Sequence, residues 1–237
     1  MFEVNKAIIM AAGEGKRMRP VTLTTPKPLV EVNGKPMIET CIDALHKNGI
    51  DEIYVVVGHL KEKFGYLTEK YDGITIIENP FYDTCNNISS LYVAREHLEN
   101  ALIMDGDQIV YNDAVLGRSY GRSGYNCTPV KTFTDEWVLE TDSDGTVKKC
   151  SRTGGDAGWQ LFSVSRWSPD DGAKLRKLLA FEFDEKKNRQ VYWDDVALIL
   201  HPNDFELTVF PMKYGDIKES DDLRELAETD SRYMKYI

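Results

Sequence analysis

The sequence predicts an α/β fold in which a mixed, mostly parallel sheet is flanked by helices. Short apolar runs rich in β-branched residues recur in the first half of the chain, and each predicts a buried strand. These runs are Ala7–Ala12, Ile53–Val57, Ile74–Ile77 and Ala101–Met104. Segments with helical periodicity lie between them, at Met37–Lys47 and Lys61–Lys70. Strands that alternate with helices indicate β-α-β units, whose ligands bind beyond the carboxyl ends of the strands.

Beyond about residue 125 the pattern becomes rich in strands. Three strand-like pieces are predicted, and the last two are joined by a hairpin turn at Ser143-Asp144-Gly145. The pieces are Thr128–Phe133, Trp137–Thr141 and Thr146–Cys150. The remaining expected elements are two helices, a strand and a terminal helix, at Pro169–Phe181, Trp193–Leu200, Leu207–Phe210 and Ser220–Thr229. Because no linker-like tract interrupts the chain, we expect a single domain, 1–237, with a small β-rich portion in its second half.

The composition restricts the class of protein. A chain of 237 residues with 42% hydrophobic and 29% charged residues suits one large folded domain. Its net charge of −10 works against binding long nucleic acids or anionic membranes, so we expect neither as a partner. The apolar N-terminal stretch is short and ends in glycine and charge, unlike a signal peptide or a membrane span. The cysteines lack CxxC spacing, which favours a reducing cytoplasm over a zinc site or a disulfide framework; they are Cys41, Cys85, Cys127 and Cys150.

The first predicted strand runs directly into a glycine-rich, basic segment, AIIMAAGEGKRMRP, from Ala7 to Pro20. Small residues let the backbone approach a base and a triphosphate, and the free N–H groups of such a loop bind anionic oxygens. The residues expected to line a nucleotide here are Ala11, Ala12, Gly13, Gly15 and Lys16. Arg17 and Lys27 add full positive charge, although a solvated basic loop is an alternative interpretation.

Two widespread phosphate-binding motifs fit this segment poorly. The third glycine of GxGxxG is absent, because Met18 stands at its position. The P-loop needs Ser or Thr after Gly-Lys, whereas Gly15-Lys16 is followed by Arg17. A nucleotide site of another type is therefore required.

Two carboxylates follow the fourth predicted strand, in Asp105-Gly106-Asp107. Residues two positions apart at a strand end project to the same side, so both can face a ligand at the edge of the sheet. Carboxylate oxygens suit the hard Mg²⁺ ion, which makes Asp105 and Asp107 candidate metal ligands. An ordinary Asp-Gly turn explains the same residues equally well.

The string AAGEGKRMRPVT is followed by Thr25-Pro26-Lys27-Pro28-Leu29 and later by Asn33-Gly34-Lys35-Pro36. This long string closely resembles the signature of nucleotide-sugar pyrophosphorylases and their relatives. The resemblance implies a Rossmann-like, GT-A-like nucleotidyltransferase fold. It implies further that Arg17 and Lys27 stabilise charge in the transition state, and that Asp107 and a late aspartate, Asp194, hold Mg²⁺ against the triphosphate.

Other segments match in the second half and in the middle of the chain: Asp135-Glu136-Trp137, Val191-Tyr192-Trp193-Asp194, and the run from Cys85 to Tyr92. Together they resemble N-E-W, Y-W-D and N-N-x-x-S-L-Y of the bacterial phosphocholine cytidylyltransferases of the LicC type. The resemblance implies that CTP and phosphocholine give CDP-choline and pyrophosphate, with a nucleotide-binding part at 1–125 and an acceptor-binding part at 126–237. A monomer or homodimer is expected. Asn87 would contact the nucleotide, unless it caps the helix that follows.

The acceptor assignment depends on aromatic and acidic residues. A quaternary ammonium has no N–H to donate, so aromatic faces and nearby negative charge hold it. Trp137 and Tyr192 are the expected cage, unless they are core aromatics. Asp216 matches a family Glu, whereas Lys218 stands where the family usually has Asp. A sugar 1-phosphate, 2-aminoethylphosphonate or another amino-alkyl phosphate remains an alternative acceptor, and an inactive regulatory or binding protein with this fold remains an alternative class.

Overall fold

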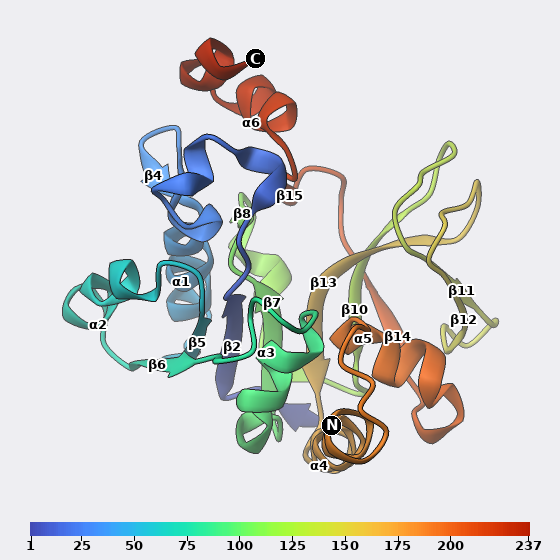
Figure 1. Ribbon diagram of the computed structural model, residues 1–237. Coiled ribbons are helices and arrows are strands. Elements are labelled where there is room, and N and C mark those ends of the chain that lie inside the picture. Colours follow the sequence, from blue (N-terminus) through green and yellow to red (C-terminus); the bar gives the residue numbers. More distant parts are fainter.

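The computed structural model describes residues 1–237, and a central sheet with helices on both faces organises the chain (Figure 1). Seven strands follow the order β12-β11-β13-β7-β2-β5-β6, and β10 pairs with both β13 and β14. The strands of the first half are β2 (Lys6–Ala11), β5 (Glu52–Val57), β6 (Ile74–Glu78) and β7 (Ala101–Asp105). They are parallel to one another, with β2 between β5 and β7. The predicted α/β fold with a mixed sheet is confirmed.

Helices cover both faces of this sheet, because the side chains that its parallel strands direct to either face are apolar. Helix α1 (Met37–Lys47) has the predicted bounds and packs on the face that includes Ile9. Ile8, on the opposite face, packs in the cluster that holds α3 (Ile88–Val93) and α4 (Pro169–Ala180). A strand buried on both faces is apolar throughout, which is the pattern that predicted β2.

The second half of the chain extends the sheet with mostly antiparallel strands. They are β10 (Gly124–Pro129), β11 (Val138–Thr141), β12 (Val147–Ser151), β13 (Trp159–Trp167) and β14 (Thr208–Pro211). The nine residues of β13 pair with β10, β11 and β7, and this strand joins the two halves into one sheet. The predicted turn at Ser143-Asp144-Gly145 does connect β11 to β12, and Gly145 has a φ of +76°.

Several predicted bounds were wrong. The strand predicted at Thr128–Phe133 lies earlier, in β10, because the chain leaves the sheet after Pro129, which has no N–H to continue the ladder. Strand β13 was not predicted. The helix predicted at Lys61–Lys70 divides at Gly65 into a 3-10 turn, η4 (Lys61–Phe64), and α2 (Tyr66–Lys70). The helix at Trp193–Leu200 also divides, into α5 (Trp193–Asp195) and a π-helical turn, η8 (Val196–Leu200).

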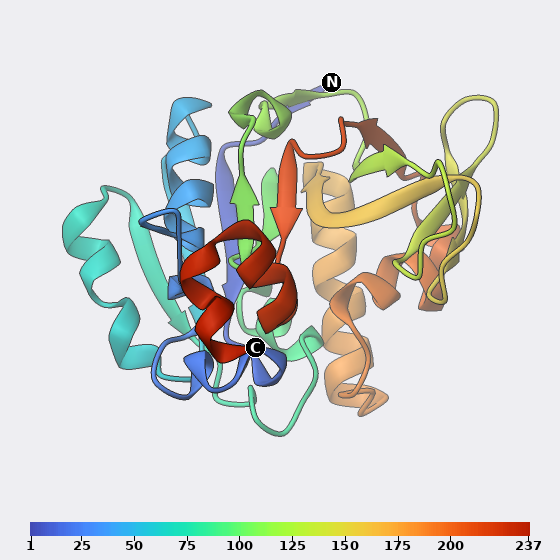
Figure 2. The same cartoon turned by 90° about the horizontal axis from the view of Figure 1, so that it is seen from above.

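The C-terminal segment returns to the N-terminal half of the molecule. Strand β15 (Ile217–Glu219) pairs with β8 (Gln108–Val110), which follows β7 directly. Helix α6 (Leu223–Thr229) then buries Leu226 in a cluster with Met18 and Val30. Figure 2 shows the red C-terminal helices over the blue loops that follow β2. Residues 217–237 therefore help to build the edge of the sheet at which the glycine-rich segment lies.

The remaining strands are short. They are β1 (Phe2–Glu3), paired with β9 (Ser119–Tyr120), and β3 (Glu31–Val32), paired with β4 (Lys35–Pro36). No helix combines the length and the apolar composition that crossing a membrane requires.

Candidate active site

The glycine-rich segment forms a tight loop at the carboxyl end of β2. Ala11 and Ala12 are buried, and the carbonyl oxygen of Ala12 accepts the N–H of His59 at 3.0 Å. Gly15 has a φ of +59°, and a Cβ there would lie 2.9 Å from Cγ2 of Thr22. Gly13 has open space on its Cβ side. The loop thus exposes Gly13 to a ligand, while Gly15 supplies the left-handed turn that shapes the loop.

Two basic residues beside the loop, Arg17 and Lys27, meet two acids. Lys27 is buried, and its Nζ lies 2.6 Å from Oδ2 of Asp107 and 2.9 Å from Oδ1 of Asp221. Burial by itself would lower the pKa of Lys27, but the two carboxylates outweigh it and raise that pKa above its ordinary value. Arg17 reaches the same oxygen of Asp221 at 3.0 Å. Lys27 is therefore a permanent cation beside the loop, and Arg17 is a more exposed one.

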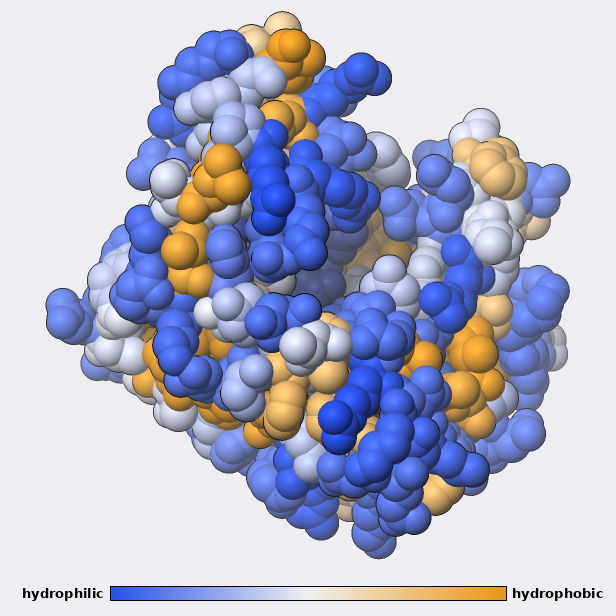
Figure 3. All heavy atoms as spheres, in the orientation of Figure 1, coloured by the Kyte–Doolittle hydropathy of each residue, from blue (hydrophilic) through white to orange (hydrophobic).

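These residues line a cavity of about 380 Å³ at the end of the parallel strands. Most of the residues that the sequence predicted to bind a nucleotide line this cavity: Ala11, Gly13, Gly15, Lys16, Arg17, Lys27 and Asp107. Tyr82 and Asp221 also line it, and the sequence did not predict them. Figure 3 shows a hollow between the C-terminal helices and the β11–β12 hairpin, lined mainly by hydrophilic residues. Glycines, cations and three carboxylates, Glu14, Asp107 and Asp221, line this cavity, which suits a triphosphate that is bound together with a metal cation.

Buried carboxylates from three parts of the chain act on one another beside this cavity. Burial and the negative charges of Asp107, Glu219 and Asp194 raise the pKa of Asp105 well above its ordinary value. Burial also raises the pKa of Asp194 to about 8. A bound cation would stabilise the ionised form of these carboxylates, so this region can bind a cation.

The donor set fits a magnesium ion that is shared with a ligand. No three His, Cys, Asp or Glu side chains converge as a preformed cage. Asp194, however, has a buried Oδ1 atom without a hydrogen-bond partner. Mg²⁺ commonly takes one or two carboxylates and completes its shell with water and substrate phosphates. The chemistry of Asp107 and Asp194 therefore fits Mg²⁺; Asp107 lines the 380 Å³ cavity, and Asp194 does not.

Asn87 connects the middle of the chain to the segment that carries Asp194. Its side-chain Oδ1 accepts the backbone N–H of Trp193 at 2.9 Å. Trp193 is fully buried, so this bond fixes the start of α5 and with it the adjacent Asp194. Asn87 does not cap α3 through its side chain. Its observed contact positions Asp194, and Asn87 does not line the 380 Å³ cavity.

A second cavity, of about 330 Å³, adjoins the first and is strongly acidic. The carboxylates that line it are Glu136, Glu219, Asp221, Glu225 and Glu228. Asp221 lines both cavities. Burial, with the negative charges of Asp107 and Asp221, raises the pKa of Glu219 to about 7, although Gln108 donates a hydrogen bond to it at 2.6 Å. The arrangement suits a cationic group placed next to a phosphate.

Sequence reasoning did not find Glu219 and Asp221. They lie two positions apart at the end of a strand, as Asp105 and Asp107 do, and that spacing was a usable signal. Asp216, the acid that the sequence favoured, lies in the turn before β15. Its two carboxylate oxygens accept the side chain of Asn112 at 3.0 Å and the N–H of Lys213 at 2.7 Å. Asp216 thus stabilises the turn from which the acidic strand starts.

The two predicted cage aromatics do lie together. The ring centroids of Trp137 and Tyr192 are 5.6 Å apart, and the rings are almost perpendicular. Tyr192 is exposed and Trp137 is partly buried, so neither is a fully enclosed core residue. The guanidinium of Arg152 faces both rings.

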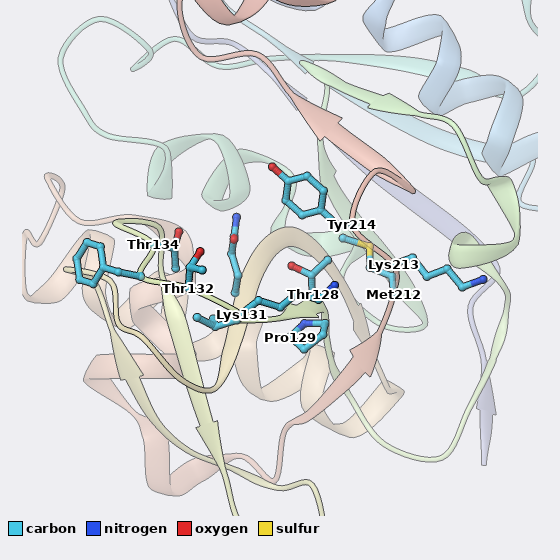
Figure 4. Close-up of a pocket in the computed structure, with 11 residues that line it drawn as sticks. Thr128, Pro129, Lys131, Thr132, Thr134, Met212, Lys213 and Tyr214 are labelled. Atoms are coloured by element: carbon cyan, nitrogen blue, oxygen red, sulfur yellow. The ribbon is translucent and has the colours of Figure 1, made fainter.

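A larger cavity of about 550 Å³ lies beside the acidic one (Figure 4). Its labelled residues come from the end of β10 and the loop after it, and from the loop after β14. It shares Gln160 and Tyr214 with the acidic cavity and contains none of the predicted site residues. Size alone therefore does not identify the active site of this molecule.

A comparison with family models matches residues 7–134 to the MobA-like NTP transferase domain. This region contains the glycine-rich loop, Lys27 and Asp107. The chain belongs to the MobA-like NTP transferase family. It is a nucleotidyltransferase, as its named relatives are.

Relatives with named activities match most of the length of this chain. It is 38% identical over 98% of its length to a 2-aminoethylphosphonate cytidylyltransferase of Lancefieldella rimae, of which it covers 94%. It is 37% identical over 81% of its length to a choline-phosphate cytidylyltransferase of Streptococcus pneumoniae, of which it covers 82%. A solved CTP:phosphocholine cytidylyltransferase from Streptococcus pneumoniae, LicC, superimposes with a TM-score of 0.89 at 33% identity, over 96% of this chain and 98% of that one. The resemblance stated from sequence is confirmed, and the relatives differ in their acceptors.

Proposed function

We propose that the protein is a cytidylyltransferase whose acceptor combines a phosphonate or phosphate group with an ammonium group, and that 2-aminoethylphosphonate is its preferred acceptor. The observation that carries this proposal is the acidic cavity that shares Asp221 with the nucleotide cavity. An acceptor phosphonate must reach the α-phosphate of the nucleotide, so its ammonium end lies a few bonds away, toward Glu219 and Asp221. A primary ammonium donates three hydrogen bonds, which carboxylates accept.

The nucleotide would bind in the loop formed by Ala11, Ala12, Gly13, Gly15 and Lys16. Arg17 and Lys27 would face the triphosphate and stabilise the negative charge that spreads over it in the transition state. Asp107 and Asp194 would hold Mg²⁺, which when bound screens the charge between the reacting phosphates. In this assignment residues 1–125 bind the nucleotide and 126–237 bind the acceptor, and Asp221 contacts both substrates.

The reaction is an in-line displacement at phosphorus. An oxygen of the acceptor phosphonate forms a bond to the α-phosphorus of CTP, and the bond from that phosphorus to the bridging oxygen of the β-phosphate breaks. The bridging oxygen keeps the electron pair and leaves as part of pyrophosphate. No general base is required, because the acceptor oxygen is already ionised near neutral pH. The protein therefore contributes position and electrostatic stabilisation.

Phosphocholine is the second candidate acceptor, and the sequence by itself favours it. The perpendicular pair of Trp137 and Tyr192 supports it, because aromatic faces bind a quaternary ammonium. The match to LicC over 96% of the chain supports it as well. If phosphocholine is the acceptor, Asp216 is the acid proposed to add negative charge near its quaternary ammonium.

A pyrophosphate-release screen tests both candidates. The four common NTPs are crossed with 2-aminoethylphosphonate, phosphoethanolamine, phosphocholine and several sugar 1-phosphates, in the presence of Mg²⁺. We expect release with CTP and ammonium acceptors, and the largest kcat/KM with 2-aminoethylphosphonate. A preference for a sugar 1-phosphate would contradict the acidic acceptor site. Calorimetry with CTP and Mg²⁺ accompanies the screen, since binding without release under every condition would indicate the regulatory alternative.

A further inference from the structure

The faces of the aromatic pair are already engaged by a cation of the protein itself. The Cζ atom of Arg152 lies 5.3 Å from the ring centroid of Trp137 and 5.5 Å from that of Tyr192. Both distances fall within the range in which a guanidinium is attracted to an aromatic face. Arg152 thus makes the contact that a choline head group would make with the same two rings.

A buried acid attracts Arg152 to this position. Nη1 of Arg152 lies 3.4 Å from Oδ1 of Asp195, whose side chain is only 1% exposed. The other carboxylate oxygen of Asp195 accepts the backbone N–H of Tyr192 at 2.8 Å. One carboxylate therefore holds the backbone of Tyr192 by a hydrogen bond and attracts the guanidinium of Arg152 as an ion pair.

A guanidinium and a trimethylammonium group cannot both occupy the pair, because they carry like charge and need the same ring faces. In the neighbouring acidic cavity Lys218 is the single basic lining residue among five acids, and of those acids Asp221 is the one that Lys27 and Arg17 also pair with. We propose that Arg152 determines acceptor specificity, by occupying the Trp137–Tyr192 pair and directing acceptors with a primary ammonium to the acidic cavity. This inference rests on the proposed function and goes further by naming the residue that selects between its two candidate acceptors.

We expect Arg152 to discriminate only moderately between the quaternary and the primary ammonium acceptor. The side chain of Arg152 is 45% exposed, so a quaternary ammonium can displace it at a cost. That cost is the loss of the arginine–aromatic and Asp195 contacts, which corresponds to roughly ten-fold in affinity. Removal of the guanidinium should therefore open the pair to choline without affecting the triphosphate site.

The test compares the wild type with Arg152→Ala by the ratio of kcat/KM for phosphocholine to that for 2-aminoethylphosphonate. We expect this ratio to rise about ten-fold in Arg152→Ala. In the double variant Arg152→Ala/Trp137→Ala the gain should disappear, since one ring face is lost. Arg95→Ala is the matched control, because Arg95 also stacks on a tyrosine, Tyr92, at 4.1 Å, but contacts neither ring of the Trp137–Tyr192 pair. The ratio in this control should equal that of the wild type.

Calorimetry with CDP-choline gives a readout that does not depend on turnover. We expect CDP-choline to bind about ten-fold more tightly to Arg152→Ala than to the wild type, while the affinity for CTP stays the same. If Arg152→Ala changes neither the CDP-choline affinity nor the acceptor ratio, the inference is overturned. An equal loss of kcat/KM with both acceptors also overturns it, because Arg152 would then bind the phosphorus group that the acceptors share. If no protein releases pyrophosphate with any acceptor, the proposed function fails, and the calorimetric comparison still decides the role of Arg152. Circular dichroism and thermal unfolding establish that each variant is folded.

Discussion

Lys27 Nζ lies 2.6 Å from Oδ2 of Asp107, and this ion pair joins the 3-10 turn η3 (Lys27–Leu29) to the turn that follows β7. Asp221 completes the pair from the C-terminal segment, at 2.9 Å from the same nitrogen. The lysine charge is thus balanced by carboxylates that come from distant parts of the chain. A bound triphosphate would compete with those carboxylates for Lys27, which places Asp107 and Asp221 at the centre of the predictions that follow.

Asp107→Ala should abolish turnover and leave the fold intact. The change removes a proposed Mg²⁺ ligand and the closest partner of Lys27, whereas Asp107 is not part of any apolar cluster. Pyrophosphate release with Mg²⁺ and far-UV circular dichroism check the two parts. Asp144→Ala in the exposed β11–β12 turn is the control and should behave as the wild type. Activity retained by Asp107→Ala at saturating Mg²⁺ would sink the metal assignment.

The use of ammonium acceptors should rise as the pH increases through about 7. Burial raises the pKa of Glu219 to about 7, so its carboxyl is largely neutral below that pH and anionic above it. The anionic form is the one that attracts an ammonium group. We expect kcat/KM for 2-aminoethylphosphonate to increase between pH 6 and pH 8, and Glu219→Gln to flatten the part of the profile that the phosphonate itself does not cause. Identical profiles in the two proteins would exclude Glu219 from acceptor binding.

Asp221→Asn and Asp216→Asn separate two candidate acceptor residues. Asp221 lines both cavities, and its loss should raise the KM for 2-aminoethylphosphonate about ten-fold, the effect of a charge-assisted hydrogen bond of ~1.5 kcal/mol. Asp216 stabilises a turn through Asn112 and Lys213, so Asp216→Asn should change stability more than KM. Steady-state kinetics with both acceptors decide the matter. A larger rise of KM in Asp216→Asn would restore the residue that the sequence favoured.

Two glycine substitutions in one loop should have different effects. Gly15→Ala places a Cβ 2.9 Å from Thr22 at a φ of +59°, so we expect it to lower the free energy of unfolding by about 1–2 kcal/mol. Gly13→Ala meets nothing within 4 Å and should leave the stability unchanged. Because Gly13 lines the nucleotide cavity, it should nevertheless weaken CTP binding. Urea denaturation and calorimetry with CTP measure the two effects; full CTP affinity in Gly13→Ala would argue against close approach of the nucleotide there.

Local patterns determined the first half of the fold. The β-branched runs predicted β2, β5, β6 and β7, because strands buried on both faces need apolar residues throughout. The bounds of α1 followed from its apolar face, which packs against one neighbouring sheet. The strands of the second half were harder to predict from sequence. In β10 the buried residues include Asn126 and Thr128, and in β13 they include Ser165 and Arg166, so neither strand has an apolar pattern that marks it.

The candidate site divides in the same way. The sequence by itself predicted the glycine-rich loop, Lys27 and Asp107 from local motifs, and the resemblance to a known family added Asp194. Only the tertiary structure brought Glu219 beside Gln108, 111 positions earlier in the chain, through the pairing of β15 with β8. It likewise placed Arg152 on the aromatic pair. Contacts of this kind depend on which strands pair and which surfaces are buried together, and that outcome is decided by the packing of the whole chain.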